Sequence, residues 1–166
     1  MRHRHIMQLF KRHPTRLADF DYRTAAFCFI TICIQNRRCI LSRIVGEGLA
    51  PPAPELTPLG KVAEEELLNL PNRFPSVSID KYVIMPNHIH IILTLADTGE
   101  RDFSPSVSSV IGAYKSITTR KSGYGRNLFQ RSFYDHIIRA QEDYWAIWKY
   151  IDENPVKWQL DKFYCN

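Results

Sequence analysis

The chain has 166 residues, and its composition, 45% hydrophobic and 23% charged, is typical of a globular protein with one sizeable core. The longest apolar run, residues 89–96, is far too short to cross a bilayer, and no apolar segment follows the basic N-terminus as in a signal peptide. A net charge of +5 favours a polyanionic partner such as nucleic acid, so we expect a cytoplasmic, nucleoid-associated protein without membrane contact.

The N-terminal segment is basic and irregular, and its composition predicts a flexible arm, residues 1–15, able to contact phosphates. The remaining residues, 16–166, show no repeat or linker, which predicts a single domain. The cysteines lack metal-finger spacing and are predicted to be reduced thiols. They are Cys28, Cys33, Cys39 and Cys165.

A first strand is predicted over residues 25–34, which are rich in Phe, Ile, Thr and Cys. It is apolar on both faces, which indicates a central place in its sheet. A turn at 36–38 and a Gly- and Pro-rich loop at 46–54 are expected to follow.

Two amphipathic helices are predicted in the first two thirds of the chain. The first begins at Thr57, a good N-cap, followed by Pro58 at the first helical position, and ends before Pro71. The second covers 107–117, where apolar residues recur with helical spacing.

Strands are predicted over 77–85 and 88–95, joined as a hairpin by a short Pro-Asn turn, and over 128–138. A third helix is expected from Asp143 until Pro155 limits it. The order strand, helix, hairpin, helix, strand, helix predicts an α+β fold. We expect a ferredoxin-like antiparallel sheet with helices on one face and a C-terminal helix that carries Tyr150.

Two histidines, His88 and His90, flank one isoleucine in the strand 88–95. Side chains alternate along a strand, so both imidazoles point to one face, separated by roughly 6–7 Å along the strand. That spacing allows both to bind one metal ion. A buried sheet does not normally carry two such polar groups unless they have partners.

Tyr150 and Asn154 lie one turn apart on the third helix, at the edge of its apolar stripe. Alone, such a tyrosine usually serves packing. With His88 and His90, the carboxamide oxygen of Asn154 can hold a divalent cation that polarises a phosphoryl oxygen. The phenol is then a nucleophile that forms a phosphotyrosine. Mixed nitrogen and oxygen ligands fit Mg²⁺ or Mn²⁺, and imidazole favours Mn²⁺.

Other residues have competing interpretations. Tyr134 and Tyr144 are rival nucleophiles, although Tyr144 falls on the buried stripe of its helix. His136 is interpreted as a structural histidine. Basic side chains suit phosphate contacts, but helix-end charge compensation or surface solvation explains them equally well. These candidate DNA-binding residues are Lys115, Arg120, Lys121, Arg131 and Arg139.

The segment 83–90, Val-Ile-Met-Pro-Asn-His-Ile-His, resembles the HUH signature (His, bulky apolar, His) of single-tyrosine transposases. Within that group the chain resembles the tyrosine transposases associated with repetitive extragenic palindromes (REPs), over residues 16–158. Further matching segments are 21–22, 29–33, 36–37, 59–61, 111–112, 115–116, 130–131, 134–139, 150–151 and 154–156.

This resemblance implies His88 and His90 as metal ligands, Asn154 as a third ligand and Tyr150 as the nucleophile. It implies an enzyme that cleaves single-stranded DNA near hairpins, through a covalent 5′-phosphotyrosine and a free 3′-hydroxyl, and rejoins strands. No nucleotide cofactor is implied. The family includes monomers and homodimers that place one subunit's tyrosine helix at the other's histidines, so both states stay open.

Two other functions are compatible with the same residues. A ferredoxin-like sheet with aromatic side chains can bind single-stranded nucleic acid without any chemistry. A His-x-His metal site can also serve an enzyme that acts on small molecules. Neither alternative explains the tyrosine and asparagine one turn apart on a late helix.

Overall fold

The computed structural model describes residues 26–46, 50–96, 105–125 and 127–165. The predicted N-terminal arm, 1–15, lies outside these residues, and the single domain over 16–166 stays a prediction. Among the described residues, no helix has the length and apolar character needed to cross a bilayer.

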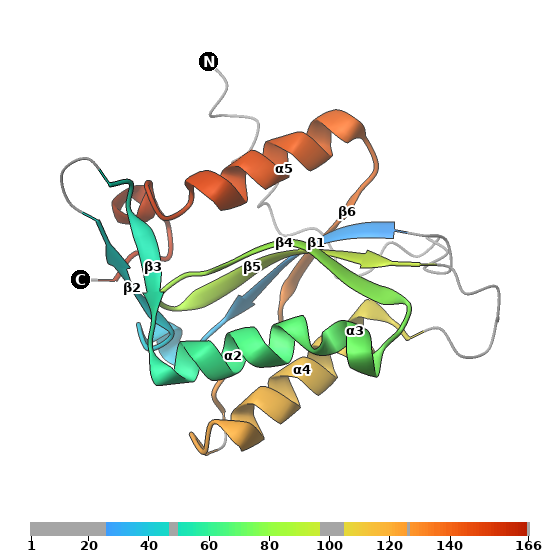
Figure 1. The fold of residues 1–166 in the computed structure, drawn as a ribbon, viewed down its shortest axis with the longest axis horizontal. Helices are drawn as coiled ribbons and strands as arrows, with labels where there is room; N and C mark the ends of the chain where they lie inside the picture. The colour runs from blue at the N-terminus through green and yellow to red at the C-terminus, as the bar shows by residue number, and fades with distance from the viewer. Residues whose placement is uncertain (1–25, 47–49, 97–104, 126, 166) are drawn as a thin grey trace.

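A four-stranded antiparallel sheet forms the centre of the structure, with the order β4-β5-β1-β6 (Figure 1). Its strands are β1 (Ala26–Cys33), β4 (Val77–Ile84), β5 (His88–Leu95) and β6 (Tyr134–Ile138). This sheet and its helices confirm the predicted α+β, ferredoxin-like class. The inner strands β1 and β5 are the most buried, and the inner position of β1 is as its apolar residues on both faces predicted.

Helices cover both faces of the sheet (Figure 1). One face carries α2 (Pro58–Leu68), the short α3 (Leu70–Arg73) and α4 (Val107–Lys121). The other face carries α5 (Gln141–Glu153), which is followed by the 3₁₀ helix η2 (Trp158–Leu160). The C-terminal helix is therefore separated from the others by the sheet, and each face has its own apolar core.

The alternation of side chains in β5 decides which residues meet α5. Ile89 and Ile91 pack into the core shared with α2 and α4, whereas Ile92 packs into the core under α5. His88 and His90 are on the same side of the strand as Ile92, so they face α5. Both histidines are fully buried.

Several boundaries differ from the sequence predictions. The predicted loop 46–54 overlaps a two-stranded hairpin of β2 (Ser42–Val45) and β3 (Ala53–Leu56). The predicted strand 128–138 is shorter, because the chain makes one isolated bridge at Phe129 and becomes a strand only at Tyr134. The predicted turn at 36–38 overlaps the 3₁₀ helix η1 (Gln35–Arg37).

The start of the first helix is as the sequence predicts. Thr57 is the N-cap, and its side chain accepts a hydrogen bond from the backbone N–H of Gly60 at 3.1 Å. The helix ends at Leu68, and Pro71 then lies inside α3, in the first turn where a proline is tolerated.

Candidate metal centre and active site

His88 and His90 converge at the middle of the sheet. Their Nε2 atoms are 3.0 Å apart, closer than the roughly 6–7 Å that separates alternate residues along a strand, because the two rings tilt toward each other. Two ligands at about 2.1 Å from one metal ion, at right angles, have this separation.

The tautomer of His88 is fixed by Asn87. The side-chain amide of Asn87 donates hydrogen bonds to the carbonyls of Phe163, at 2.7 Å, and Arg37, at 3.2 Å. Its Oδ1 therefore faces His88 Nδ1, at 2.9 Å, and accepts the ring proton. The Nε2 atom of His88 consequently carries a lone pair toward His90.

The other ring is held by Thr31, which lies opposite His90 in the β1–β5 register. The hydroxyl Oγ1 of Thr31 is 2.8 Å from His90 Nδ1. A hydroxyl can accept or donate, so His90 can either donate from Nε2 to His88 or direct a lone pair beside that of His88. The second arrangement is the one that ligates a metal.

Burial and nearby positive charges keep the imidazole rings of His88 and His90 neutral. Burial lowers the pKa of His88 to about 3; nearby Lys162 and Arg37 also lower it, and the nearby carboxamide of Asn154 offsets this in part. Burial likewise holds the pKa of His90 well below its usual range, and His88 and Lys162 add to the effect. Neutral imidazole is the form that binds a metal ion.

Helix α5 brings Tyr150 and Asn154 to the histidines. Ile147 and Ile151 are buried against the sheet and seat the helix on it. The hydroxyl of Tyr150 lies 3.4 Å from Nε2 of His90, within the same chain. Burial raises the pKa of Tyr150, and so does the charge of Asp161, so the phenol is protonated at neutral pH.

Asp161, just after η2, is a site residue that the sequence analysis missed. Its Oδ2 accepts a hydrogen bond from Nδ2 of Asn154 at 3.1 Å. One carboxylate oxygen of Asp161 and one nitrogen from each of His88 and His90 all lie within 4.8 Å of one another. A single aspartate in a segment without helical or strand periodicity gave no signal in the sequence.

A disulfide anchors the segment that carries Asp161. It joins Cys39 to Cys165, so the prediction of reduced thiols is wrong for these two residues, whereas Cys28 and Cys33 are free. The pair is 126 residues apart in the sequence, and no local spacing indicates it.

The residues present fit a divalent cation. Asn154 is 3% exposed, and its Oδ1 atom accepts no hydrogen bond from the described residues. Because its amide group donates to Asp161, this oxygen is left as a buried acceptor. Two imidazole nitrogens and one carboxamide oxygen therefore offer lone pairs in one buried place, which a cation satisfies and an apolar core does not.

The rival residues have other environments. Tyr144 donates its hydroxyl to Asp80 at 3.4 Å, and its ring packs on Phe27, at the far end of α5. Tyr134 lies opposite Thr31 in the register and so shares the histidine face. His136 bonds Asp143 at 2.8 Å, which agrees with its interpretation as a structural histidine.

Two of the five basic candidates, Lys115 and Lys121, make contacts within the fold. Lys115 donates to the carbonyls of Gln130 at 3.0 Å, Arg131 at 3.3 Å and Ser132 at 3.1 Å. Lys121 forms an ion pair with buried Glu66. These contacts give both lysines a structural role.

The candidate arginines are placed differently. Arg120 and Arg131 line a cleft of about 550 Å³ between the C-terminal half of α4 and the segment 127–131, with Gly123 and Gly125 at its side. Arg139 is exposed directly after β6. The three guanidinium groups are not brought together with the histidine pair.

No family model matches the chain, but similar proteins are found among known sequences and solved structures. An uncharacterized protein of Haemophilus influenzae is 31% identical over 174 residues, 93% of this chain and 94% of the relative. A REP-associated tyrosine transposase of Escherichia coli is 37% identical over 79 residues, 48% of this chain and 44% of the relative. A solved structure of a REP-associated tyrosine transposase bound to a REP hairpin matches with a TM-score of 0.65 and 26% identity, covering 86% of this chain and 74% of that one.

The fold and the site thus define a class, the α+β proteins in which a histidine pair on an antiparallel sheet faces a tyrosine on a late helix. The chain belongs to the family of REP-associated tyrosine transposases, which confirms the resemblance carried by its sequence motifs. This relationship groups it with nuclease and transposase enzymes that act on DNA.

Proposed function

We propose that the protein is a metal-dependent transposase that cleaves single-stranded DNA near hairpins and rejoins strands through a covalent 5′-phosphotyrosine. The observation that carries the proposal is the 3.4 Å contact between the Tyr150 hydroxyl and His90, beside the 3.0 Å pair of His88 and His90 nitrogens. Since all three side chains come from one chain, a monomer has the whole constellation.

In this proposal His88, His90 and Asn154 hold Mn²⁺ or Mg²⁺, which supplies charge stabilisation at a phosphoryl oxygen. Tyr150 attacks the phosphorus: the phenolic O–P bond forms, the P–O3′ bond breaks, and the 3′-oxygen leaves with a proton as a hydroxyl. The phenolic proton passes to water. Attack by a 3′-hydroxyl on the phosphotyrosine reverses the step and joins strands, so no nucleotide cofactor is needed.

The proposed partner is single-stranded DNA with hairpin ends. A relative of the chain binds a REP hairpin, and the cleft beside α4 presents Arg120 and Arg131, whose guanidinium groups suit phosphate oxygens. Shape and unpaired bases are the features by which such folded single strands are recognised.

The test is a denaturing gel of the protein with labelled hairpin DNA and Mn²⁺ or Mg²⁺. The wild type is expected to form a covalent adduct, and Tyr150→Phe to reduce it at least ~10³-fold while DNA binding stays intact. Tyr144→Phe is the matched control and retains the adduct. An adduct that persists in Tyr150→Phe contradicts the assignment, and tight DNA binding by a wild type that never forms an adduct indicates a binding module instead.

A further inference from the structure

The metal ligands proposed so far carry no negative charge. His88, His90 and Asn154 are neutral. The cationic groups of Arg37 and Lys162 lie 4.9 and 4.8 Å from the centre of the Phe163 ring, which packs on His88 with ring centroids 4.6 Å apart. A divalent cation at this place therefore meets a positive local potential in a buried setting, where uncompensated charge is costly. A carboxylate ligand removes this difficulty.

Asp161 is the acidic group in reach. Among the described residues there is one cluster of three His, Cys, Asp or Glu side chains with metal-binding geometry, and it consists of Asp161 with the two histidines. Its ligand atoms all lie within 4.8 Å of one another. Two ligand atoms on opposite sides of an octahedral ion are roughly 4.2 Å apart. A movement of roughly half an ångström by the Asp161 carboxylate toward the histidines is therefore enough for all three side chains to bind one ion.

The hydrogen bonds of Asp161 leave room for a metal. Its Oδ1 accepts from the backbone N–H of Phe163 at 2.7 Å, and its Oδ2 accepts from Asn154 at 3.1 Å. A carboxylate has about four lone-pair sites, so two remain after these bonds are made. The same two bonds fix the direction in which the carboxylate points.

We propose that Asp161 is a direct metal ligand, which completes a set of two imidazoles, one carboxamide and one carboxylate. This inference rests on the proposed function, which places the metal at the histidine pair. The resulting N₂O₂ set with one negative charge suits Mn²⁺ better than Mg²⁺, because the two imidazoles favour the softer ion.

The test measures Mn²⁺ binding by calorimetry on the purified full-length protein without DNA. Asp161→Asn keeps an oxygen that can accept from Asn154 but loses the charge, and it is expected to weaken Mn²⁺ binding by about 10-fold or more. Asp152→Asn is the matched control: Asp152 lies exposed on α5, paired with Lys81, and its substitution leaves the affinity within about twofold.

A second readout separates ligation from mere positioning. Loss of a direct ligand atom admits one more water to the bound Mn²⁺, so the water-proton relaxivity of the Asp161→Ala complex is expected to exceed that of the wild type. An unchanged affinity in Asp161→Asn, together with an Asp161→Ala complex whose relaxivity equals that of the wild type, reduces Asp161 to a positioning residue and overturns the inference. Mn²⁺ affinity that His90→Ala leaves unchanged contradicts the proposed metal site itself, which distinguishes the two failures.

Discussion

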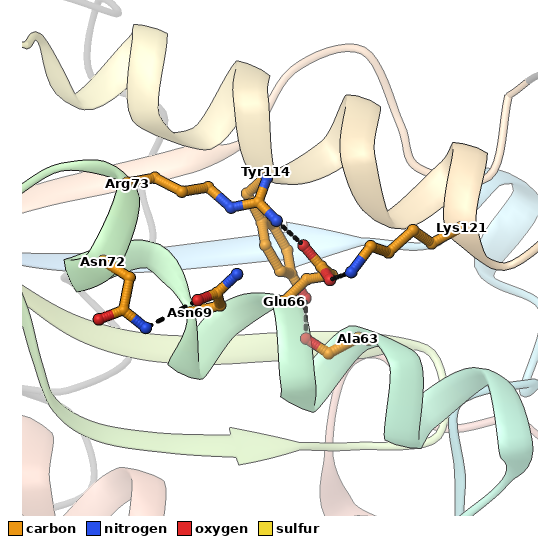
Figure 2. Close-up of polar contacts among 7 residues, drawn as sticks. All are labelled: Ala63, Glu66, Asn69, Asn72, Arg73, Tyr114 and Lys121. Carbon is orange, nitrogen blue, oxygen red and sulfur yellow. Dashed lines mark hydrogen bonds and ion pairs between the residues drawn. The ribbon is translucent and has the colours of Figure 1, made fainter.

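The two faces of the sheet bury polar groups in different ways. On the face of α2 and α4, the buried carboxylate of Glu66 is paired with Arg73 at 2.7 Å and Lys121 at 2.5 Å (Figure 2). On the face of α5, the Nε2 atoms of His88 and His90 lie 3.0 Å apart, and the buried Oδ1 of Asn154 accepts no hydrogen bond from the described residues. The buried carboxylate of the first face is neutralised by cations of the protein, whereas the second face keeps a buried carboxamide oxygen that a bound cation would satisfy.

The cluster in Figure 2 joins three helices and has a structural role. Glu66 extends from α2 to Arg73 of α3 and Lys121 of α4, and the hydroxyl of Tyr114 on α4 donates to the carbonyl of Ala63 at 3.0 Å. Nearby, the side-chain amide of Asn72 donates a hydrogen bond to Oδ1 of Asn69 at 2.8 Å, where α2 meets α3. The buried polar groups of this face hold helices together, whereas those of the α5 face gather where His88, His90 and Asp161 could bind one metal ion.

The largest expected effect is on the α5 face. His90→Ala removes one proposed ligand and is expected to lower metal-dependent cleavage by about 10³-fold, equivalent to about 4 kcal/mol of transition-state stabilisation. The measurement is adduct yield against time with labelled hairpin DNA at saturating Mn²⁺. Cleavage at the wild-type rate would remove the histidines from the site.

A substitution on the face of α2 and α4 is expected to change the stability of the protein and not its cleavage activity. Glu66→Gln breaks the buried ion pairs and is expected to lower the free energy of unfolding by about 3 kcal/mol, while the adduct yield per folded molecule is unchanged. Urea unfolding measures the first quantity, with the exposed Glu65→Gln as control. A Glu66→Gln protein that is stable but inactive would break the distinction between the faces.

The stability of the α5 face is expected to depend on pH through His88. The pKa of His88 is about 3 in the folded protein and 6.5 ordinarily, so below pH 6.5 the unfolded chain binds a proton that the folded protein excludes. In EDTA, the free energy of unfolding is therefore expected to fall as pH falls from 6.5 toward 3, by up to about 1.4 kcal/mol per pH unit for this residue.

The measurement is urea unfolding of the wild type and of His88→Gln at pH 7, 6 and 5. The free energy of unfolding of His88→Gln is expected to fall less steeply with falling pH, by up to about 1.4 kcal/mol per pH unit. Equal slopes would indicate that the imidazole titrates freely and is not held neutral by burial.

The smallest effect concerns a single hydrogen bond on the structural face. Tyr114→Phe removes the hydroxyl that donates to Ala63 and is expected to cost about 1 kcal/mol of stability with no change in cleavage. Thermal and urea unfolding of the two proteins give the difference. A loss of several kcal/mol would show that the cluster around Glu66 depends on this hydroxyl.

Strong periodicity made much of the fold predictable. The strand His88–Leu95 has the predicted bounds, because its apolar run is flanked by a Pro-Asn turn, and the N-cap Thr57 begins its helix as predicted. The hairpin of β2 and β3 was missed, because its short strands lie in a segment rich in glycine and proline.

The site was predictable only in part. Alternation in a strand and spacing in a helix place His88 with His90 and Tyr150 with Asn154, and the structure brings the two pairs together. The position of Asp161 depends on the path of the chain after η2 and on a disulfide between distant cysteines, neither of which is encoded in a local pattern.

The central claim is that the histidine pair and the tyrosine helix share one cation. Anomalous diffraction at the manganese edge, from crystals of the full-length protein grown with Mn²⁺, tests it most directly. We expect a single ion bound by Nε2 of His88 and of His90 and by Oδ1 of Asn154, with the Tyr150 hydroxyl beside it. Histidine rings still bonded to each other at saturating Mn²⁺, with the ion bound elsewhere, would show that the histidine pair is not a metal site.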